Sequence, residues 1–382
     1  MPGRFLSTRY AAFYGAFFLT FGVYLPFWPV WLAHRGLTPE QIGVVLAVGS
    51  WVKVLGIPAV AQISDRSGRP KITFTVVAVL TVLSVAAYLP AQGFWAILAV
   101  TVVAAALSQS MNPLAESLTM AAVARERLDY GRIRLWGSLA FILGTAGAGR
   151  LLTGRDAELI LLLVLAGFVL TLGAVLMYPD QRPPRATTGW RGVTTLLTDR
   201  RFVVFLIAAS LMQASHAVYY GFSALHWKAA GLSETTIGWL WAEGVIAEVL
   251  LFAVGGAVVA RIGPAGLLIV AGAAGVLRWV VLGVSTDLIA LVAVQGLHAA
   301  TFGAVHLGAV HFIARAAPPG LAATAQAAYA AVSGGIAMGL AMLFAGRLYE
   351  AFGGSAFHAM AALCATGALL AILLARRSSA AK

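Results

Sequence analysis

Six ionisable side chains lie inside long apolar stretches of the chain. They are three acids and three bases: Glu116, Glu243, Glu248, Lys53, Arg134 and Arg278. An ionised side chain at the centre of a bilayer costs about 2.5–3.5 kcal/mol on insertion scales. Six such charges would cost roughly 15–20 kcal/mol, more than the ~5–15 kcal/mol net stability of a typical protein. We therefore expect these groups to be paired, protonated or in contact with a wet cavity, as in a path for polar solutes or ions through a membrane.

The composition is that of an integral membrane protein. Hydrophobic residues make up 60% and charged residues 10% of the 382 residues, whereas a soluble domain carries about 25% charge. The net charge of +12 does not indicate nucleic acid, because the bases gather in alternate loops and form no single stripe. The single cysteine, Cys364, excludes a disulfide framework.

The sequence offers no pattern for metal, nucleotide or hydrolase chemistry. It has no metal-ligand cluster, no phosphate-binding loop and no nucleophile elbow of the G-x-S-x-G type. We therefore expect no enzyme, no metal and no cofactor, with a proton gradient as the source of energy.

Apolar runs long enough to cross a bilayer recur along the whole chain. They fall at about 10–33, 41–63, 72–91, 94–122, 131–153, 158–178, 202–227, 236–260, 265–285, 287–314, 321–346 and 355–375. Each covers the ~30 Å hydrocarbon core at ~1.5 Å per residue. Only helices and closed barrels satisfy the backbone in lipid, and barrel strands alternate with a period of two, which these runs do not. The pattern predicts an all-α membrane protein with about twelve transmembrane helices.

A basic segment at 179–201 separates the first six helices from the last six. We expect an amino-terminal bundle at 1–178, a cytoplasmic linker at 179–201 and a carboxy-terminal bundle at 202–382. With the amino terminus in the cytoplasm, most Lys and Arg residues fall in inner loops, as the positive-inside rule requires. The sequence thus predicts a multi-pass protein of the inner cell membrane with both termini in the cytoplasm.

The loop after the second helix reads AQISDRSGRPK from Ala61 to Lys71. It resembles the signature loop of the major facilitator superfamily, G-x-x-x-D-R-x-G-R-[KR], with Ala61 in place of the leading glycine and Pro70 within the basic pair. Glycine permits a tight turn, and an acidic residue can cap a helix amino terminus. The resemblance implies two six-helix bundles about a pseudo-twofold axis, and a loop that latches the two halves through Asp65, Arg66, Gly68 and Arg69.

A second motif joins the fourth and fifth helices. Pro113-x-x-Glu116 followed by Gly-Arg132-x-Arg134 resembles the branch of that superfamily that holds oligosaccharide–proton symporters and phenylpropionate permeases. The two helices form an antiparallel hairpin, so Glu116 and Arg134 share a similar depth, and we expect them to be charge partners on the cavity wall. Arg132 points ~200° away from Arg134 and lies nearer the loop. A purely structural ion pair is the alternative.

The carboxy-terminal half also places an acid and an arginine at a similar depth on antiparallel helices. Glu248 and Arg278 are equally distant from the turn at Gly263-Pro264, so they share a depth on neighbouring helices. Where the sugar symporters carry a glutamate one turn after their histidine, this chain has Thr301, which cannot titrate. We therefore expect the proton at Glu248, Glu243 or His298, with Arg278 between Glu248 and His298. Glu243 lies ~140° around the helix from Glu248, so the two should not serve one face.

Histidines and aromatic residues provide further candidates. The run from His298 through Thr301 to His306 resembles the phenylpropionate permease branch, and His306 lies about 80° around the helix from His298. Membrane histidines are most often packing residues, and His298 is the one for which we expect a role. His306 is placed to face the same cavity, and His216 is either a packing residue or a member of the site. An aromatic stripe on the first helix, at residues 14, 17, 21, 24 and 28, indicates either an aromatic-solute wall or helix packing.

We interpret the chain as a secondary active transporter that couples protons to a small organic solute by alternating access. The phenylpropionate-like branch implies an aromatic carboxylate, with Arg278, Arg134 or Lys53 binding its anion. Drug–proton efflux, nucleoside or sugar symport, and a transport-inactive sensor are the alternatives. The expected partners are the solute, protons and the lipid bilayer, with no nucleic acid, and we expect a monomer.

Overall fold

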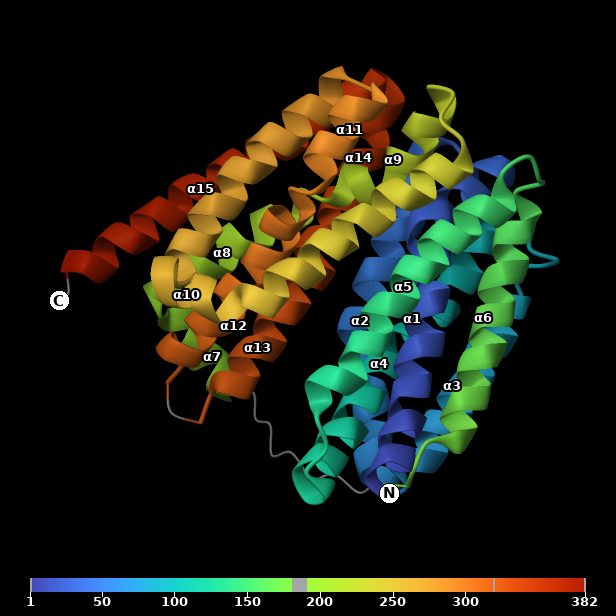
Figure 1. Ribbon diagram of the computed structural model, residues 1–382, viewed down its shortest axis with the longest axis horizontal. Coiled ribbons are helices and arrows are strands. Elements are labelled where there is room, and N and C mark those ends of the chain that lie inside the picture. The colour runs from blue at the N-terminus through green and yellow to red at the C-terminus, as the bar shows by residue number, and fades with distance from the viewer. Residues whose placement is uncertain (1, 181–190, 319, 381–382) are drawn as a thin grey trace. The chain divides into compact units, whose positions relative to one another are not determined.

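The computed structural model describes residues 2–180, 191–318 and 320–380, and within these ranges it contains helices and no strand (Figure 1). Of the linker predicted at 179–201, the part at 181–190 lies outside the described residues, and the part at 191–198 is helical. The first helices are α1 (Pro2–His34), α2 (Pro39–Ser67), α3 (Pro70–Ala86), α4 (Gly93–Glu126), α5 (Tyr130–Leu152) and α6 (Glu158–Met177).

The remaining elements begin with a short helix and include two π-helical segments. They are α7 (Arg191–Thr198), α8 (Arg200–Ala214), α9 (Ala217–Ala229), α10 (Glu234–Val284), α11 (Leu288–Gln295), η1 (Ala299–Ala304), α12 (Val305–Ala316), α13 (Ala322–Tyr329), η2 (Ala330–Ala337), α14 (Met338–Phe352), η3 (Gly353–Ala356) and α15 (Phe357–Ala380).

The predicted all-α membrane fold is confirmed. Nine stretches of the described residues are long and apolar enough to cross a membrane. Two of them, Glu234–Val284 with 51 residues and Ala322–Arg376 with 55, are long enough for two crossings each. Gly263 interrupts the first with φ 68° and ψ 171°, at the predicted turn, and Gly353 interrupts the second with φ 55°. With the shorter α3, the described helices are consistent with the twelve expected crossings.

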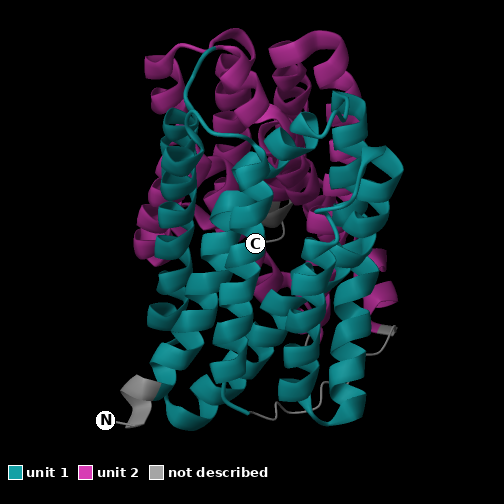
Figure 2. Ribbon diagram, turned by 90° about the vertical axis from the view of Figure 1, so that its right-hand side faces the viewer, with its two compact units in different colours: residues 1–186, 231–242 teal, residues 187–230, 243–382 magenta. Residues whose placement is uncertain are grey.

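The chain forms two compact units, drawn in teal and magenta in Figure 2. Unit 1 consists of residues 1–186 and 231–242, and unit 2 of residues 187–230 and 243–382. The start of α10 therefore groups with the first unit, which the predicted domain boundaries did not include.

Small residues explain why α10 begins in unit 1. A Cβ atom added at Gly149 of α5 would overlap the carbonyl oxygen of Glu234, and one added at Gly238 would overlap that of Thr145. The hydroxyls of Thr153 and Thr235 lie 2.8 Å apart at the same contact. Glycine lets two helix backbones approach this closely, as is common between membrane helices. The first turns of α10 therefore pack directly against α5.

Unit 1 is centred on the aromatic side of α1. Tyr14, Phe17 and Trp28 are at most 3% exposed, and neighbouring rings of the predicted stripe contact each other, as in Phe17 and Phe21 with centroids 4.5 Å apart. The Tyr14 hydroxyl donates to Thr119 at 3.3 Å. Much of the stripe is thus helix packing inside unit 1, which accounts for these residues without a solute.

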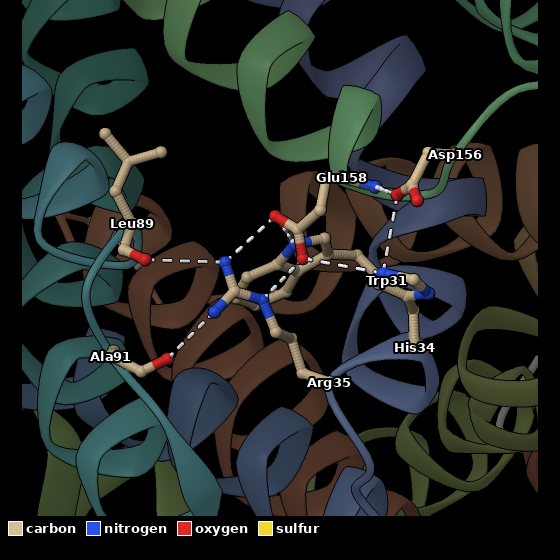
Figure 3. Close-up of polar contacts among 7 residues, drawn as sticks. All are labelled: Trp31, His34, Arg35, Leu89, Ala91, Asp156 and Glu158. Carbon is tan, nitrogen blue, oxygen red and sulfur yellow. Dashed lines mark hydrogen bonds and ion pairs between the residues drawn. The ribbon is translucent and has the colours of Figure 1, made fainter.

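The end of α1 is joined to the start of α6 by ion pairs (Figure 3). Arg35 Nε lies 2.6 Å from Glu158 Oε1, and Arg35 Nη1 donates to the Ala91 carbonyl at 3.2 Å. Trp31 Nε1 donates to Glu158 at 3.3 Å, and His34 Nε2 lies 3.4 Å from Asp156. These contacts hold together the end of α1, the start of α6 and the connection between α3 and α4.

Basic side chains satisfy the opposite end of α6. The Lys71 ammonium donates to the carbonyls of Val175 and Leu176, and Arg9 Nε donates to the Met177 carbonyl at 2.5 Å. The last carbonyls of a helix have no partners within the helix and carry partial negative charge, so cations are favourable there. Unit 1 is therefore fastened at both ends of α1, α3 and α6.

Candidate functional site

The centre of unit 2 holds a buried arginine whose hydrogen bonds all go to neutral groups. Arg278 of α10 is 0% exposed. Its Nη2 donates to Gln295 Oε1 at 2.8 Å, and its Nη1 donates to Thr301 Oγ1 at 2.9 Å and His298 Nδ1 at 3.1 Å. The three acceptors come from α11, from η1 and from the residue just before η1. They hold the guanidinium in one place.

Aromatic rings flank the same guanidinium. Its central carbon lies 4.6 Å from the ring centroid of Tyr219 and 4.7 Å from that of Trp279. Gln295 Nε2 donates to the Tyr219 hydroxyl at 3.0 Å, and Trp279 Nε1 donates to Ser215 at 3.0 Å. Cation–π contacts of this kind are strongest when water is excluded, so the rings stabilise a charge that has left water.

The bond from Arg278 fixes the proton position on His298. Arginine only donates, so His298 Nδ1 must accept, and a neutral imidazole then carries its proton on Nε2. That N–H group faces Glu248 Oε2 at 3.6 Å, a polar contact longer than a hydrogen bond. The order of the groups is therefore Arg278, His298, Glu248.

His216 is held in the opposite tautomer. Its Nδ1 lies 3.2 Å from the carbonyl oxygens of Met212 and Gln213, which only accept, so Nδ1 carries the proton. Its Nε2 therefore accepts, and the Thr301 hydroxyl, 3.3 Å away, is the donor. Thr301 thus accepts from Arg278 and donates to His216, which connects the second histidine to the cluster.

A local change of helix type shapes this site. Residues Ala299–Ala304 form a π-helix directly after His298, and Thr301 lies within it. Single π-helical turns inside α-helices are rare and occur frequently at functional sites. The widened turn lies between α11 and α12. It carries Thr301, one acceptor of Arg278 Nη1, and follows directly after His298, the other acceptor.

The structure brings together the predicted residues of the second half, with one correction. Glu248, His298 and Arg278 do form one cluster, but Arg278 does not lie between the other two. His298 occupies that position, because its two ring nitrogens face opposite neighbours. Glu243 is partly exposed, and no hydrogen bond or ion pair joins it to a described residue. His306 is exposed, with its ring 5.9 Å from that of Phe252.

Two members of the cluster were missed by sequence reasoning. Gln295 is the amide partner of Arg278, and Tyr219 supplies both a ring and a hydroxyl. An amide inside the apolar run LIALVAVQGL, three residues before His298, was the available signal for Gln295. Tyr219 carried no signal, because its neighbours Tyr220 and Phe222 make it one of several aromatic residues.

In unit 1 the predicted ion pair between Glu116 and Arg134 is wrong. No ion pair joins these two described residues, and Glu116 Oε1 instead accepts a hydrogen bond from the Tyr130 hydroxyl at 2.7 Å. Tyr130 begins α5, one turn before Arg134, and its long side chain reaches Glu116 first. The Arg134 side chain turns to α1.

Arg134 has aromatic partners on α1. Its guanidinium carbon lies 4.1 Å from the ring centroid of Phe18 and 5.6 Å from that of Tyr14. Gly137 makes room for this arrangement, since a Cβ atom there would lie 2.7 Å from Arg134 Nη1 and 2.9 Å from the Phe18 ring. No carboxylate pairs with Arg134 among the described residues, so its donors remain available for an anion.

The other basic candidates of unit 1 differ in their surroundings. Lys53 of α2 is partly buried, and no hydrogen bond or ion pair joins its ammonium to a described residue. Arg132 is 88% exposed and its Nε lies 3.1 Å from Asp129. Arg132 is thus a surface residue at the start of α5, whereas Lys53 is a membrane cation without an anionic partner in the described part of the chain.

The signature loop adopts the predicted turn but not the predicted cap. Gly68 ends α2 in the left-handed conformation with φ 61°. Arg69 precedes α3, no side chain caps that helix, and Asp65 forms no hydrogen bond or ion pair with a described residue. Pro70 opens α3, and a proline at this position has no N–H that needs a cap. Asp65, Arg66 and Arg69 are exposed, and their role in gating stays a prediction.

The described residues contain no group of three or more His, Cys, Asp or Glu side chains arranged to hold a metal ion. The chemistry available in the two units is therefore that of charges, hydrogen bonds and aromatic rings. Unit 2 offers a carboxylate joined to a histidine and an arginine, and unit 1 offers cations beside aromatic rings.

Comparisons with known proteins identify the family of the chain. The model of the MFS_1 like family matches residues 7–360. The "Probable 3-phenylpropionic acid transporter" of Escherichia coli (strain K12) is 37% identical over 368 residues, covering 93% of this chain and 94% of the relative. The maltose permease of Geobacillus stearothermophilus is 26% identical, covering 97% and 95%.

Solved structures show the same fold. The crystal structure of the nucleoside transporter NupG superposes with a TM-score of 0.82 at 15% identity, covering 97% of this chain and 98% of that one. These relatives and this structure are transporters and not enzymes. The chain therefore belongs to the MFS_1 like family and is a multi-pass membrane transporter of the major facilitator superfamily.

Proposed function

We propose that the chain is a proton-coupled symporter of a small aromatic carboxylate that works by alternating access. The observation that carries the proposal is the state of Arg134. This membrane arginine lies against the rings of Phe18 and Tyr14 and has no carboxylate partner among the described residues. A guanidinium binds a carboxylate through two parallel hydrogen bonds, and ring faces and edges accept a second aromatic ring.

The solute class follows from this pair of features. An aromatic carboxylate would bring its anion to Arg134 and its ring to Phe18, which is partly exposed whereas Tyr14 is buried. Lys53 supplies a second positive charge in the same unit. The E. coli relative that is 37% identical bears the name of a 3-phenylpropionic acid transporter, which is a solute of this kind. Solute and proton each bias the two access states only through their different affinities for them.

The coupled proton binds in unit 2 at Glu248. One ring nitrogen of each histidine in the cluster already accepts a hydrogen bond, that of His298 from Arg278 and that of His216 from Thr301. A second proton on His298 would direct an N–H group at the arginine. The carboxylate is the group that can take a proton without breaking these bonds. Each chain contains both sites, so one copy is sufficient for transport and the protein acts as a monomer. The basic residues of the inner loops favour a cytoplasmic location of both termini.

Uptake into proteoliposomes tests the proposal. The purified protein is assayed with labelled 3-phenylpropionate, maltose and uridine, with and without an inside-alkaline pH gradient. We expect 3-phenylpropionate to accumulate only with the gradient and to leave when a protonophore is added. Accumulation of uridine or maltose instead would replace the proposal with nucleoside or sugar symport, and gradient-driven expulsion of cationic drugs would replace it with efflux.

A further inference from the structure

Gln295 is a neutral residue at the place where a carboxylate would be the usual partner of an arginine. Its Oε1 accepts a hydrogen bond of 2.8 Å from Arg278 Nη2, and its Nε2 donates one of 3.0 Å to the Tyr219 hydroxyl. Arg278 and Gln295 are 0% exposed and Tyr219 is 2% exposed. The amide offers no opposite charge to offset the arginine, and a buried charge without a directly bonded counter-charge is costly in the interior of a protein.

Hydrogen-bond geometry does not explain the amide. A glutamate at 295 has the same length and would accept the bond from Arg278 Nη2 at least as well. The Tyr219 hydroxyl accepts from the amide now, and it would rotate to donate to a carboxylate, since a phenol does both. Charge, rather than shape, is therefore what distinguishes glutamine from glutamate at this position.

The charges around Arg278 come from several elements. The titratable side chains are Glu243 and Glu248 of α10, Tyr219 and Tyr220 of α9, His216 before α9, His298 before η1 and Cys364 of α15. His298 connects Arg278 to the carboxylate of Glu248. Its Nδ1 lies 3.1 Å from Arg278 Nη1, and its Nε2 lies 3.6 Å from Glu248 Oε2.

We propose that Gln295 is a positioning residue that holds Arg278 without cancelling its charge, so that protonation of Glu248 leaves an uncompensated positive charge in unit 2. This inference rests on the proposed function, since it explains why a proton would promote binding of an anion. With Glu248 ionised, the arginine and the glutamate balance. With Glu248 protonated, the cluster carries a net positive charge.

The test is a proton titration that needs no solute. The purified protein in nanodiscs is titrated alongside its Glu248→Gln variant, and the difference gives the proton bound at Glu248. The same difference is measured in the Gln295→Glu background. We expect Gln295→Glu to move the midpoint upward by about one pH unit, a tenfold change in proton affinity, because the new carboxylate offsets Arg278.

An unchanged midpoint in a folded Gln295→Glu protein would overturn the inference. If that variant does not fold, Thr301→Asp places a carboxylate at the other nitrogen of Arg278 and tests the same claim. In proteoliposomes, Gln295→Glu should lose gradient-driven accumulation of 3-phenylpropionate while keeping counterflow. A wild-type protein that does not transport this solute would overturn the proposed function, whereas the titration would still decide the role of Gln295.

Discussion

The two units place their membrane charges in opposite ways. Unit 2 gathers Arg278 and its neutral partners into one buried cluster with an ordered chain of hydrogen bonds. Unit 1 leaves Arg134 on aromatic rings, and its tightest described ion pair, Arg35 with Glu158, lies at the end of the helices. A charge whose bonds are satisfied within the protein holds structure, whereas a charge without an anion is available to a ligand. Under the proposed function, we therefore expect proton binding in unit 2 and solute binding in unit 1.

The largest effect expected is that of Arg278→Gln on folding. The change removes the donor of three buried acceptors and leaves Glu248 without its counter-charge. Removing one partner of a buried charge network costs about 3–5 kcal/mol. The variant should therefore express poorly and unfold at a clearly lower temperature in detergent, as measured by fluorescence-detected size exclusion. Expression and thermal stability equal to those of the wild type would contradict the claim that the Arg278 cluster stabilises unit 2.

Arg134→Gln should affect binding much more than folding. Its present partners are rings, and an exposed or partly exposed cation–π contact contributes only about 0.5–1 kcal/mol. A lost charge-assisted bond to a carboxylate costs roughly 1.5–3 kcal/mol, or at least about tenfold in affinity. We expect weak binding of 3-phenylpropionate with nearly normal thermal stability, measured by calorimetry on the purified protein.

Arg134→Lys is the matched control for that variant. Lysine keeps the charge but cannot form two parallel bonds, so its affinity should lie between those of the wild type and Arg134→Gln. Equal affinity in all three proteins would remove Arg134 from the solute site and leave Lys53 as the cation of unit 1.

Glu158→Gln and His34→Gln should have the smallest effects. The Glu158 side chain is 37% exposed, and partly exposed ion pairs contribute up to about 1 kcal/mol. We expect a modest fall in thermal stability with normal transport, and a still smaller fall for His34→Gln. Loss of transport in a stable Glu158→Gln protein would show that the end of unit 1 does more than fasten its helices.

Hydropathy was sufficient to predict the membrane helices, whereas the arrangement as two six-helix bundles about a pseudo-twofold axis was implied by the resemblance of the signature loop. Each apolar run needed only length and composition to predict a helix, and the glycine turns at Gly68 and Gly263 followed from the sequence. The assignment of the start of α10 to unit 1 could not be predicted from the sequence. It depends on the close approach of Gly149 and Gly238, which is a tertiary contact between distant segments.

The candidate site was predicted in part. Depth matching brought Glu248, Arg278 and His298 together, since depth follows from counting residues from a turn. The same reasoning failed for Glu116 and Arg134, because depth does not fix the direction of a long side chain and Tyr130 reaches the carboxylate first. The π-helix at Ala299–Ala304 changes which residues share a face, and no local pattern indicates it.

The central claim, that the proton binds in unit 2 and the solute in unit 1, is tested most directly by Glu248→Gln in proteoliposomes. Counterflow exchanges solute without net proton movement, whereas accumulation against a gradient needs the coupled proton. The account predicts that Glu248→Gln keeps counterflow of 3-phenylpropionate and loses pH-driven accumulation, while Glu116→Gln keeps both. Intact accumulation in Glu248→Gln, together with its loss in Glu116→Gln, would contradict the account and place the proton in unit 1.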